Sequence, residues 1–141
     1  MVAVGIDVSK GKSTVATISE HGELLMKVTD YHHDEKDLNE LMKKLRSFND
    51  DVRITMEATG QYHFSIRNKL IQEGFFVSVI NPYLMKKYSE SSLRKGKTDR
   101  KDALKIAAFC LEKWRTLIPY TREIKQYEDL KFLSRQYNQL I

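Results

Sequence analysis

Four acidic residues are the strongest candidates for chemistry in this sequence. Asp7 and Glu57 each end a short apolar segment that has the length of a buried β-strand. The carboxyl ends of parallel strands meet at one edge of a sheet, where open α/β proteins bind ligands. Asp99 and Asp102 lie three residues apart at the start of a predicted helix, so their side chains face the same way. The two pairs could therefore form one cluster.

A cluster of these acids would need a cation. Carboxylates that meet repel one another unless a positive charge lies between them. Ligands that are all oxygen favour Mg²⁺ or Mn²⁺. Two such ions about 4 Å apart can orient a nucleophile and neutralise the charge of a phosphodiester, although the spacing does not decide between one ion and two. The simpler alternative is that each acid only ends a strand in solvent or caps a helix.

Basic residues surround the second pair of acids. The chain has 24 Lys and Arg against 19 Asp and Glu, a formal net charge of +5 that attracts polyanions. The alternative for these side chains is that they only keep a loop solvated. We expect nucleic-acid phosphates to be bound by Lys10, Lys86, Lys87, Arg94, Lys95, Lys97, Arg100 and Lys101.

Strands and helices follow one another in an order that predicts a mixed sheet. Three strands come first, at residues 2–7, 13–19 and 24–31, and the short turns between them indicate an antiparallel meander. Strands that alternate with helices indicate parallel pairing, so we predict five strands flanked by helices. The alternating part has helices at 34–48, 62–73 and 98–114, strands at 52–57 and 75–80, and a loop at 89–97.

The last two predicted helices differ in what their apolar faces contact. In the helix at 98–114 the apolar face includes Cys110, which we therefore interpret as a core residue. After Pro119, apolar residues recur at helical spacing up to Ile141 without a capping signal. We expect the chain to stop within this helix and its apolar seam to pair with another copy.

Length and composition limit the class of protein. The 141 residues fit one domain, and no apolar run approaches the roughly 20 residues that cross a bilayer. Cys110 is the only cysteine, and the first residues lack the apolar core of a signal peptide. We expect a soluble, cytoplasmic protein that does not bind membranes. We expect its four histidines to lie at the surface.

Four segments resemble, in order, the N-terminal domain of the DEDD insertion-sequence transposases, a group that includes the pilin-gene-inverting recombinase. They are GIDVSK at 5–10, MEATG at 56–60, NP at 81–82 and KTDRKDA at 97–103. The resemblance implies a RuvC-like fold of the ribonuclease H class. It also matches Asp7, Glu57, Asp99 and Asp102, one by one, to the D, E, D and D of the family.

From the resemblance we expect strand cleavage and exchange in DNA transposition, with Mg²⁺ or Mn²⁺ as cofactor. Family members continue through a coiled coil into a second domain with a catalytic serine, and well-studied members act with a structured guide RNA. Residues 1–118 would then form the RuvC-like domain and residues 119–141 the start of the coiled coil. We expect a homo-oligomer through that helix, and an isolated chain that does not complete recombination.

Two other functions stay open from the sequence. The segment from Gly5 to Asp7, followed by a hairpin with Lys10 and Lys12, is also similar to the phosphate loop of actin-like ATPases and sugar kinases. A second glycine-rich phosphate segment and an adenosine site are not visible in the sequence. The other alternative is a non-catalytic module that binds nucleic acid and assembles with partners, its acids idle.

Overall fold

A mixed five-stranded sheet forms the centre of the molecule, with the strand order β3-β2-β1-β4-β5. The computed structural model describes residues 1–91, 99–121, 126, 129–131 and 133–134, and only the backbone of residues 91, 99 and 100. The meander of β1 (Val2–Ser9), β2 (Lys12–Ser19) and β3 (Thr29–His32) is antiparallel. The strands β4 (Val52–Glu57) and β5 (Phe76–Ile80) run parallel to β1. The predicted sheet is therefore confirmed.

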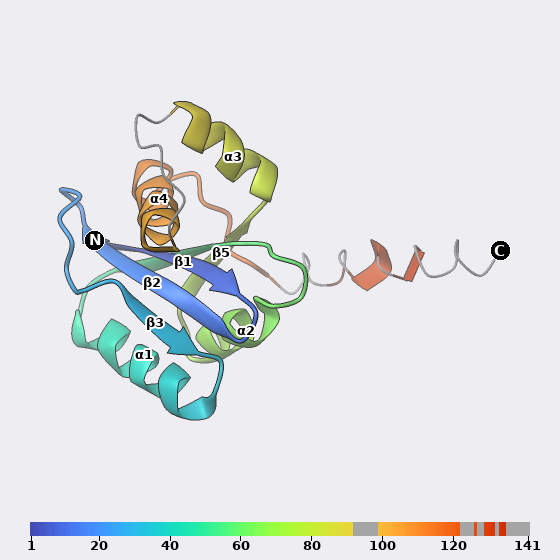
Figure 1. Ribbon diagram of the computed structural model, residues 1–141, viewed down its shortest axis with the longest axis horizontal. Helices are drawn as coiled ribbons and strands as arrows, with labels where there is room; N and C mark the ends of the chain where they lie inside the picture. Colours follow the sequence, from blue (N-terminus) through green and yellow to red (C-terminus); the bar gives the residue numbers. More distant parts are fainter. Residues whose placement is uncertain (92–98, 122–125, 127–128, 132, 135–141) are drawn as a thin grey trace.

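Helices cover both faces of this sheet (Figure 1). On one face lie α1 (Glu35–Ser47) and α2 (Phe64–Gln72), and on the other α3 (Pro82–Ser91) and α4 (Asp99–Glu112). As predicted, Asp34 caps α1: its carboxylate accepts a hydrogen bond from the backbone N–H of Asp37 at 2.8 Å. Strands covered on both faces are apolar over most of their length, and the central strand β1 is apolar and buried from Val2 to Ile6.

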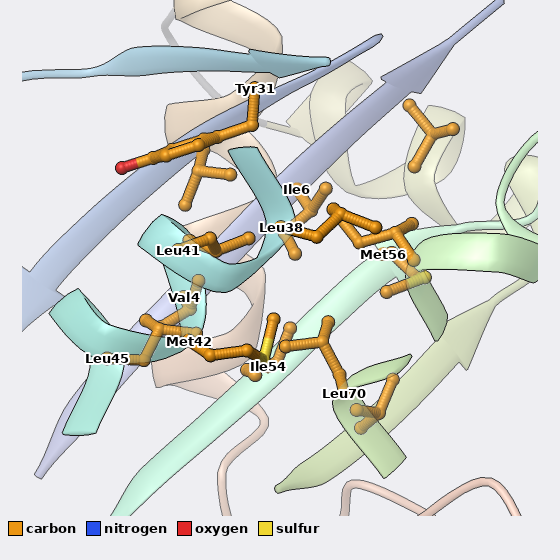
Figure 2. Packing of buried hydrophobic residues seen from close by; sticks show 14 of the residues in the cluster. Val4, Ile6, Tyr31, Leu38, Leu41, Met42, Leu45, Ile54, Met56 and Leu70 are labelled. Atoms are coloured by element: carbon orange, nitrogen blue, oxygen red, sulfur yellow. The ribbon is translucent and has the colours of Figure 1, made fainter. Parts of the chain in front are cut away.

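The larger core cluster lies between the sheet and the first two helices. Figure 2 shows the side chains of α1 pointing at the central strands, with Leu41 over Val4 and Leu38 near Ile6 and Met56. In β1 the even-numbered residues face this cluster, because successive side chains of a strand point to opposite faces. The odd-numbered residues of β1 therefore face α4.

The helix α4 crosses β1 at Gly5. A Cβ atom at Gly5 would lie 2.8 Å from the Cα of Ala107 and closer still to the backbone of Ala103 and Ala107. Only a residue without a side chain allows this approach. The predicted apolar face of α4 is buried throughout, and Cys110 is a core residue whose thiol donates to the carbonyl of Arg53 at 3.4 Å.

Two predicted elements differ from the structure. The predicted strand at 24–31 forms only at its end, as β3; before it there is a single bridge between Leu24 and Ile18, and Leu24 is exposed. The start of the predicted loop at 89–97 is also wrong, because α3 extends to Ser91. Asn81 starts α3 as an N-cap whose side chain accepts from the N–H of Tyr83 at 2.7 Å, with Pro82 at the first helical position.

The C-terminal prediction is tested only in part. Residues 126, 129–131 and 133–134 are helical, and Leu130 and Leu133 are exposed. The rest of the predicted coiled-coil start, residues 92–98 and the predicted cap Thr98 lie outside the described residues. Among the helices that the structure describes, none combines the length and the hydrophobicity of a bilayer-spanning segment.

Candidate metal centre

Asp7 and Glu57 lie at the same edge of the sheet. In the register of β1 and β4, Ile6 is opposite Met56, so Asp7 and Glu57 follow at the next position of each strand. Paired strands are about 4.8 Å apart. The side chains of both acids are half-buried. The structure therefore brings together the two acids that end strands in the sequence.

Both acids face the side of the sheet that α4 covers. On β1, Asp7 continues the series of Ala3 and Gly5, which pack against α4. On β4, Glu57 continues the series of Arg53, whose guanidinium lies 4.8 Å from the ring centroid of Trp114, at the end of the α4 region. The alternation of a strand then directs Asp7 and Glu57 to this face.

The N-terminus of α4 lies at the edge that carries these acids. Ala103 and Ala107 cross β1 at Gly5, and Trp114 reaches Arg53 near the start of β4. Moving back along α4 from Ala107 to Ala103 therefore leads toward the carboxyl ends of β1 and β4. Asp102 is the residue before Ala103 and is half-buried.

Electrostatics links the helix to the strands. Burial raises the pKa of the Glu57 carboxyl, and the negative charge of Asp102 raises this pKa further. The carboxylates of Glu57 and Asp102 are therefore close enough to repel each other. A cation between them would relieve that repulsion, and carboxylate oxygens suit a hard divalent ion.

The full predicted tetrad is only partly described. For Asp99 the structure gives the backbone position, in the first turn of α4 one turn before Asp102, and not the side chain. Among the described side chains, no group of three or more His, Cys, Asp and Glu is arranged to hold a metal ion. Carboxylate oxygens are ligands that suit Mg²⁺ or Mn²⁺. That the four carboxylates together bind such an ion stays a prediction.

Five of the predicted phosphate-binding residues lie on described elements. Lys10 is exposed in the turn between β1 and β2, directly after the strand that carries Asp7. Lys86 and Lys87 are exposed on α3, where the ammonium of Lys87 lies 5.2 Å from the ring centroid of Tyr83. Lys101 is exposed in the first turn of α4, and Arg100 precedes it there. Arg94, Lys95 and Lys97 lie outside the described residues.

A buried histidine beside the Glu57 strand was missed. The expectation that all four histidines lie at the surface is wrong for His63, which is 3% exposed. Its Nδ1 accepts a hydrogen bond from the backbone N–H of Thr59 at 3.2 Å. The sequence did contain a signal, because His63 lies three, four and seven residues before Ile66, Arg67 and Leu70, which are all buried.

Comparisons with known proteins agree on a fold and a family. The model of a DEDD transposase family, the IS110 type, which is described as transposase, matches residues 4–141. No curated protein sequence matches the chain.

Two solved structures of Thermus thermophilus RuvC are similar to this one. RuvC in complex with a Holliday junction substrate is 13% identical, with a TM-score of 0.59 over 85% of this chain and 99% of RuvC. A second RuvC structure is 15% identical, with a TM-score of 0.61 over 85% of this chain and 100% of RuvC. At these identities the likeness shows the fold, which is RuvC-like and of the ribonuclease H class.

Proposed function

Because this chain belongs to the DEDD transposase family, we propose that it is the domain that binds divalent metal and cleaves DNA strands in transposition. The observation that carries the proposal is the meeting of three elements at one edge of the sheet. There Glu57 of β4 interacts with Asp102 of α4, and Asp7 of β1 lies one strand away. The family match favours this function over an actin-like ATPase.

Each acid has a role in the proposed site. Asp7, Glu57, Asp99 and Asp102 are the proposed metal ligands, and Mg²⁺ or Mn²⁺ is the proposed ion. When bound, such an ion neutralises charge on a phosphodiester and makes a nearby hydroxyl a better nucleophile. Two of the proposed ligands belong to neighbouring strands, and the backbone positions of the other two lie one turn apart in α4. The partly buried position of Glu57 strengthens its attraction for a cation.

DNA is the proposed substrate. The net charge of +5 and the exposed Lys10, Lys86, Lys87 and Lys101 support phosphate binding around the acids. RuvC, which has the same fold, has been solved with a Holliday junction. A branched DNA is therefore the first substrate to test.

The remaining proposals rest on the family resemblance. Residues 1–118 would be the acid-bearing domain, and residues 119–141 the start of a helical segment through which two copies pair. A serine in a downstream domain and a structured guide RNA would complete the recombination reaction. In that case the acids position the strands for the serine or cut one of them.

A cleavage assay tests the proposed activity. The chain is incubated with Mn²⁺ and either a four-way junction or a linear duplex, and cut strands are resolved on a gel. We expect cleavage of the junction, reduced about 100-fold or more in Asp7→Asn and Asp102→Asn, because each variant replaces a ligand charge by an amide.

The control is Asp129→Asn, which changes an exposed carboxylate on the C-terminal helical part. Cleavage that is equal in all variants would contradict the proposal. Junction binding without any cleavage would place the chemistry in the downstream serine domain.

A further inference from the structure

The segment that follows Glu57 is held by a short chain of hydrogen bonds. Residues 58–63 connect β4 to α2, and Gly60 within them has a φ of 53°, in the left-handed region. The backbone N–H of Ala58 donates to the carbonyl of Ile80 at 3.0 Å, which fixes the segment against the end of β5. One side of the segment is thus anchored to the sheet.

Thr59 and His63 hold the other side. The hydroxyl of Thr59 donates to the carbonyl of Glu57 at 3.3 Å, and the N–H of Thr59 donates to Nδ1 of His63 at 3.2 Å. Thr59 therefore links the backbone of Glu57 directly to the imidazole of His63. Since Nδ1 is the acceptor, a neutral ring carries its proton on Nε2.

The imidazole of His63 is itself fixed by its surroundings. His63 is 3% exposed and lies edge-on to the ring of Phe64, with 4.8 Å between the ring centroids. On the next turn of α2, Arg67 is also buried, and its guanidinium lies 4.5 Å from the Phe64 centroid and 4.1 Å from the Tyr120 centroid. The ring is therefore part of a packed cluster that does not turn freely.

His63 precedes α2 in the position of its N-cap, yet it makes no side-chain capping bond to the helix. A residue chosen only to start α2 would be Ser, Thr, Asp or Asn. The ring of His63 instead folds back on the segment that leaves the metal-binding edge.

We infer that His63 is a positioning residue for Glu57: through Thr59 it fixes the backbone from which the Glu57 carboxylate reaches the metal. This inference rests on the proposed metal site. The hydrogen bonds of residues that orient metal ligands affect metal affinity as well as fold. A residue that only stabilises the fold would leave the affinity of the folded chain unchanged.

Two substitutions at His63 distinguish the effect of its hydrogen-bond acceptor from the effect of its side-chain volume. His63→Leu keeps a similar volume and removes the acceptor, whereas His63→Asn places its Oδ1 where Nδ1 stands, the same number of bonds from the backbone. Thr59→Val removes the hydroxyl bond to Glu57 and keeps the shape. Ser13→Ala is the control for lost stability, because it removes a 2.6 Å hydrogen bond to His33 on the face of the sheet that α1 and α2 cover, away from the face of the acids.

The test measures Mn²⁺ affinity of the folded chain by calorimetry, with circular dichroism to confirm folding. We expect about ten-fold weaker binding in His63→Leu and Thr59→Val. His63→Asn should stay within about three-fold of wild type, and Ser13→Ala should match it. Exchange of the Thr59 amide proton, followed by NMR in the absence of metal, should be faster in His63→Leu than in His63→Asn.

The outcomes distinguish this inference from the proposed function. If wild type and Asp102→Asn take up Mn²⁺ equally, the metal site itself is wrong, and the inference fails with it. If Asp102→Asn loses binding while His63→Leu and Thr59→Val bind like wild type, only the role of His63 is overturned. An equal loss in His63→Asn and His63→Leu also overturns it, because the acceptor would then be irrelevant.

Discussion

The charged form of Glu57 is electrostatically unfavourable in the folded chain. Burial and the charge of Asp102 both raise the pKa of its carboxyl, so the folded chain binds this proton more tightly than the unfolded chain does. The stabilisation from the bound proton is complete below the unfolded-state pKa and is lost as the pH rises through the folded-state pKa. At neutral pH without metal, this stabilisation is reduced, so Glu57 destabilises the fold relative to low pH.

Removing the charge of Glu57 should stabilise the metal-free chain. We expect Glu57→Gln to raise the melting temperature at pH 7.5 in the presence of a chelator, and to change it little at pH 3.5, where the carboxyl is protonated in both states. The control is Glu112→Gln, an exposed glutamate at the end of α4. A lower melting temperature for Glu57→Gln at pH 7.5 would contradict this account of the site.

At the scale of elements, the approach of α4 to β1 sets where the acids lie. The contact is between backbones, because a Cβ at Gly5 would meet the backbone of Ala103 and Ala107. Any shift of α4 away from Gly5 would also carry Asp102 away from Glu57. Gly5 is therefore as important to the site as the acids, although it does no chemistry.

Gly5→Ala should destabilise the fold by about 3 kcal/mol, since a packed backbone contact must open. Urea denaturation measures this loss. Gly22→Ala is the control: it has open space around it and a φ of 81°, so it costs only the backbone strain of about 1 kcal/mol. Trimming Ala107 to Gly should not rescue Gly5→Ala, because the clash is with the backbone; a full rescue would contradict this geometry.

Most elements could be predicted from the sequence because their patterns are local. The helix α1 is predicted by the capping residue Asp34 and by the apolar spacing of Leu38, Leu41 and Leu45. These signals all lie within a short stretch of sequence. The helix α3 was missed although Asn81 and Pro82 are a good start signal, because its apolar residues are few and Tyr83 and Leu84 stay exposed. The predicted strand at 24–31 is longer than β3, because composition does not show which residues pair with a neighbouring strand.

The site was harder to predict than the elements. Asp7 and Glu57 could be paired from sequence, because both follow apolar segments that the topology makes parallel neighbours. The predicted end of the first strand at Asp7 is wrong, since β1 continues to Ser9 through its pairing with β2. The electrostatic interaction between Glu57 and Asp102 depends on the path of α4 across Gly5, which no local pattern specifies. The proposed positioning role of His63 likewise depends on the conformation of residues 58–63, which brings its ring to the N–H of Thr59.

For the whole molecule, the distribution of basic residues predicts which face of the molecule contacts DNA. Lys86 and Lys87 lie on α3, which covers the same face of the sheet as α4 and its acids (Figure 1). Phosphates bound there would lie on the same side of the sheet as the proposed metal site. Lys36 and Lys43 are exposed on α1, on the opposite face.

Neutralising the α3 lysines should weaken DNA binding in a salt-dependent way. We expect Lys86→Gln with Lys87→Gln to lower junction affinity and to reduce the slope of log K against log salt by about two units, because each phosphate contact contributes about 0.9. The pair Lys36→Gln with Lys43→Gln should change neither. Fluorescence anisotropy over a salt series measures both, and equal losses for the two pairs would contradict a DNA path along α3.

The most direct test of the central claim is whether the acids of β1, β4 and α4 form one metal-binding site. Mn²⁺ is titrated by calorimetry into the wild-type chain and into Asp7→Asn, Glu57→Gln, Asp99→Asn and Asp102→Asn, with Asp129→Asn as the control, first alone and then with junction DNA. We predict that wild type and the control bind Mn²⁺ and that each of the four variants loses this binding. Binding that survives in the four variants, or no binding by wild type even with DNA, would contradict the claim.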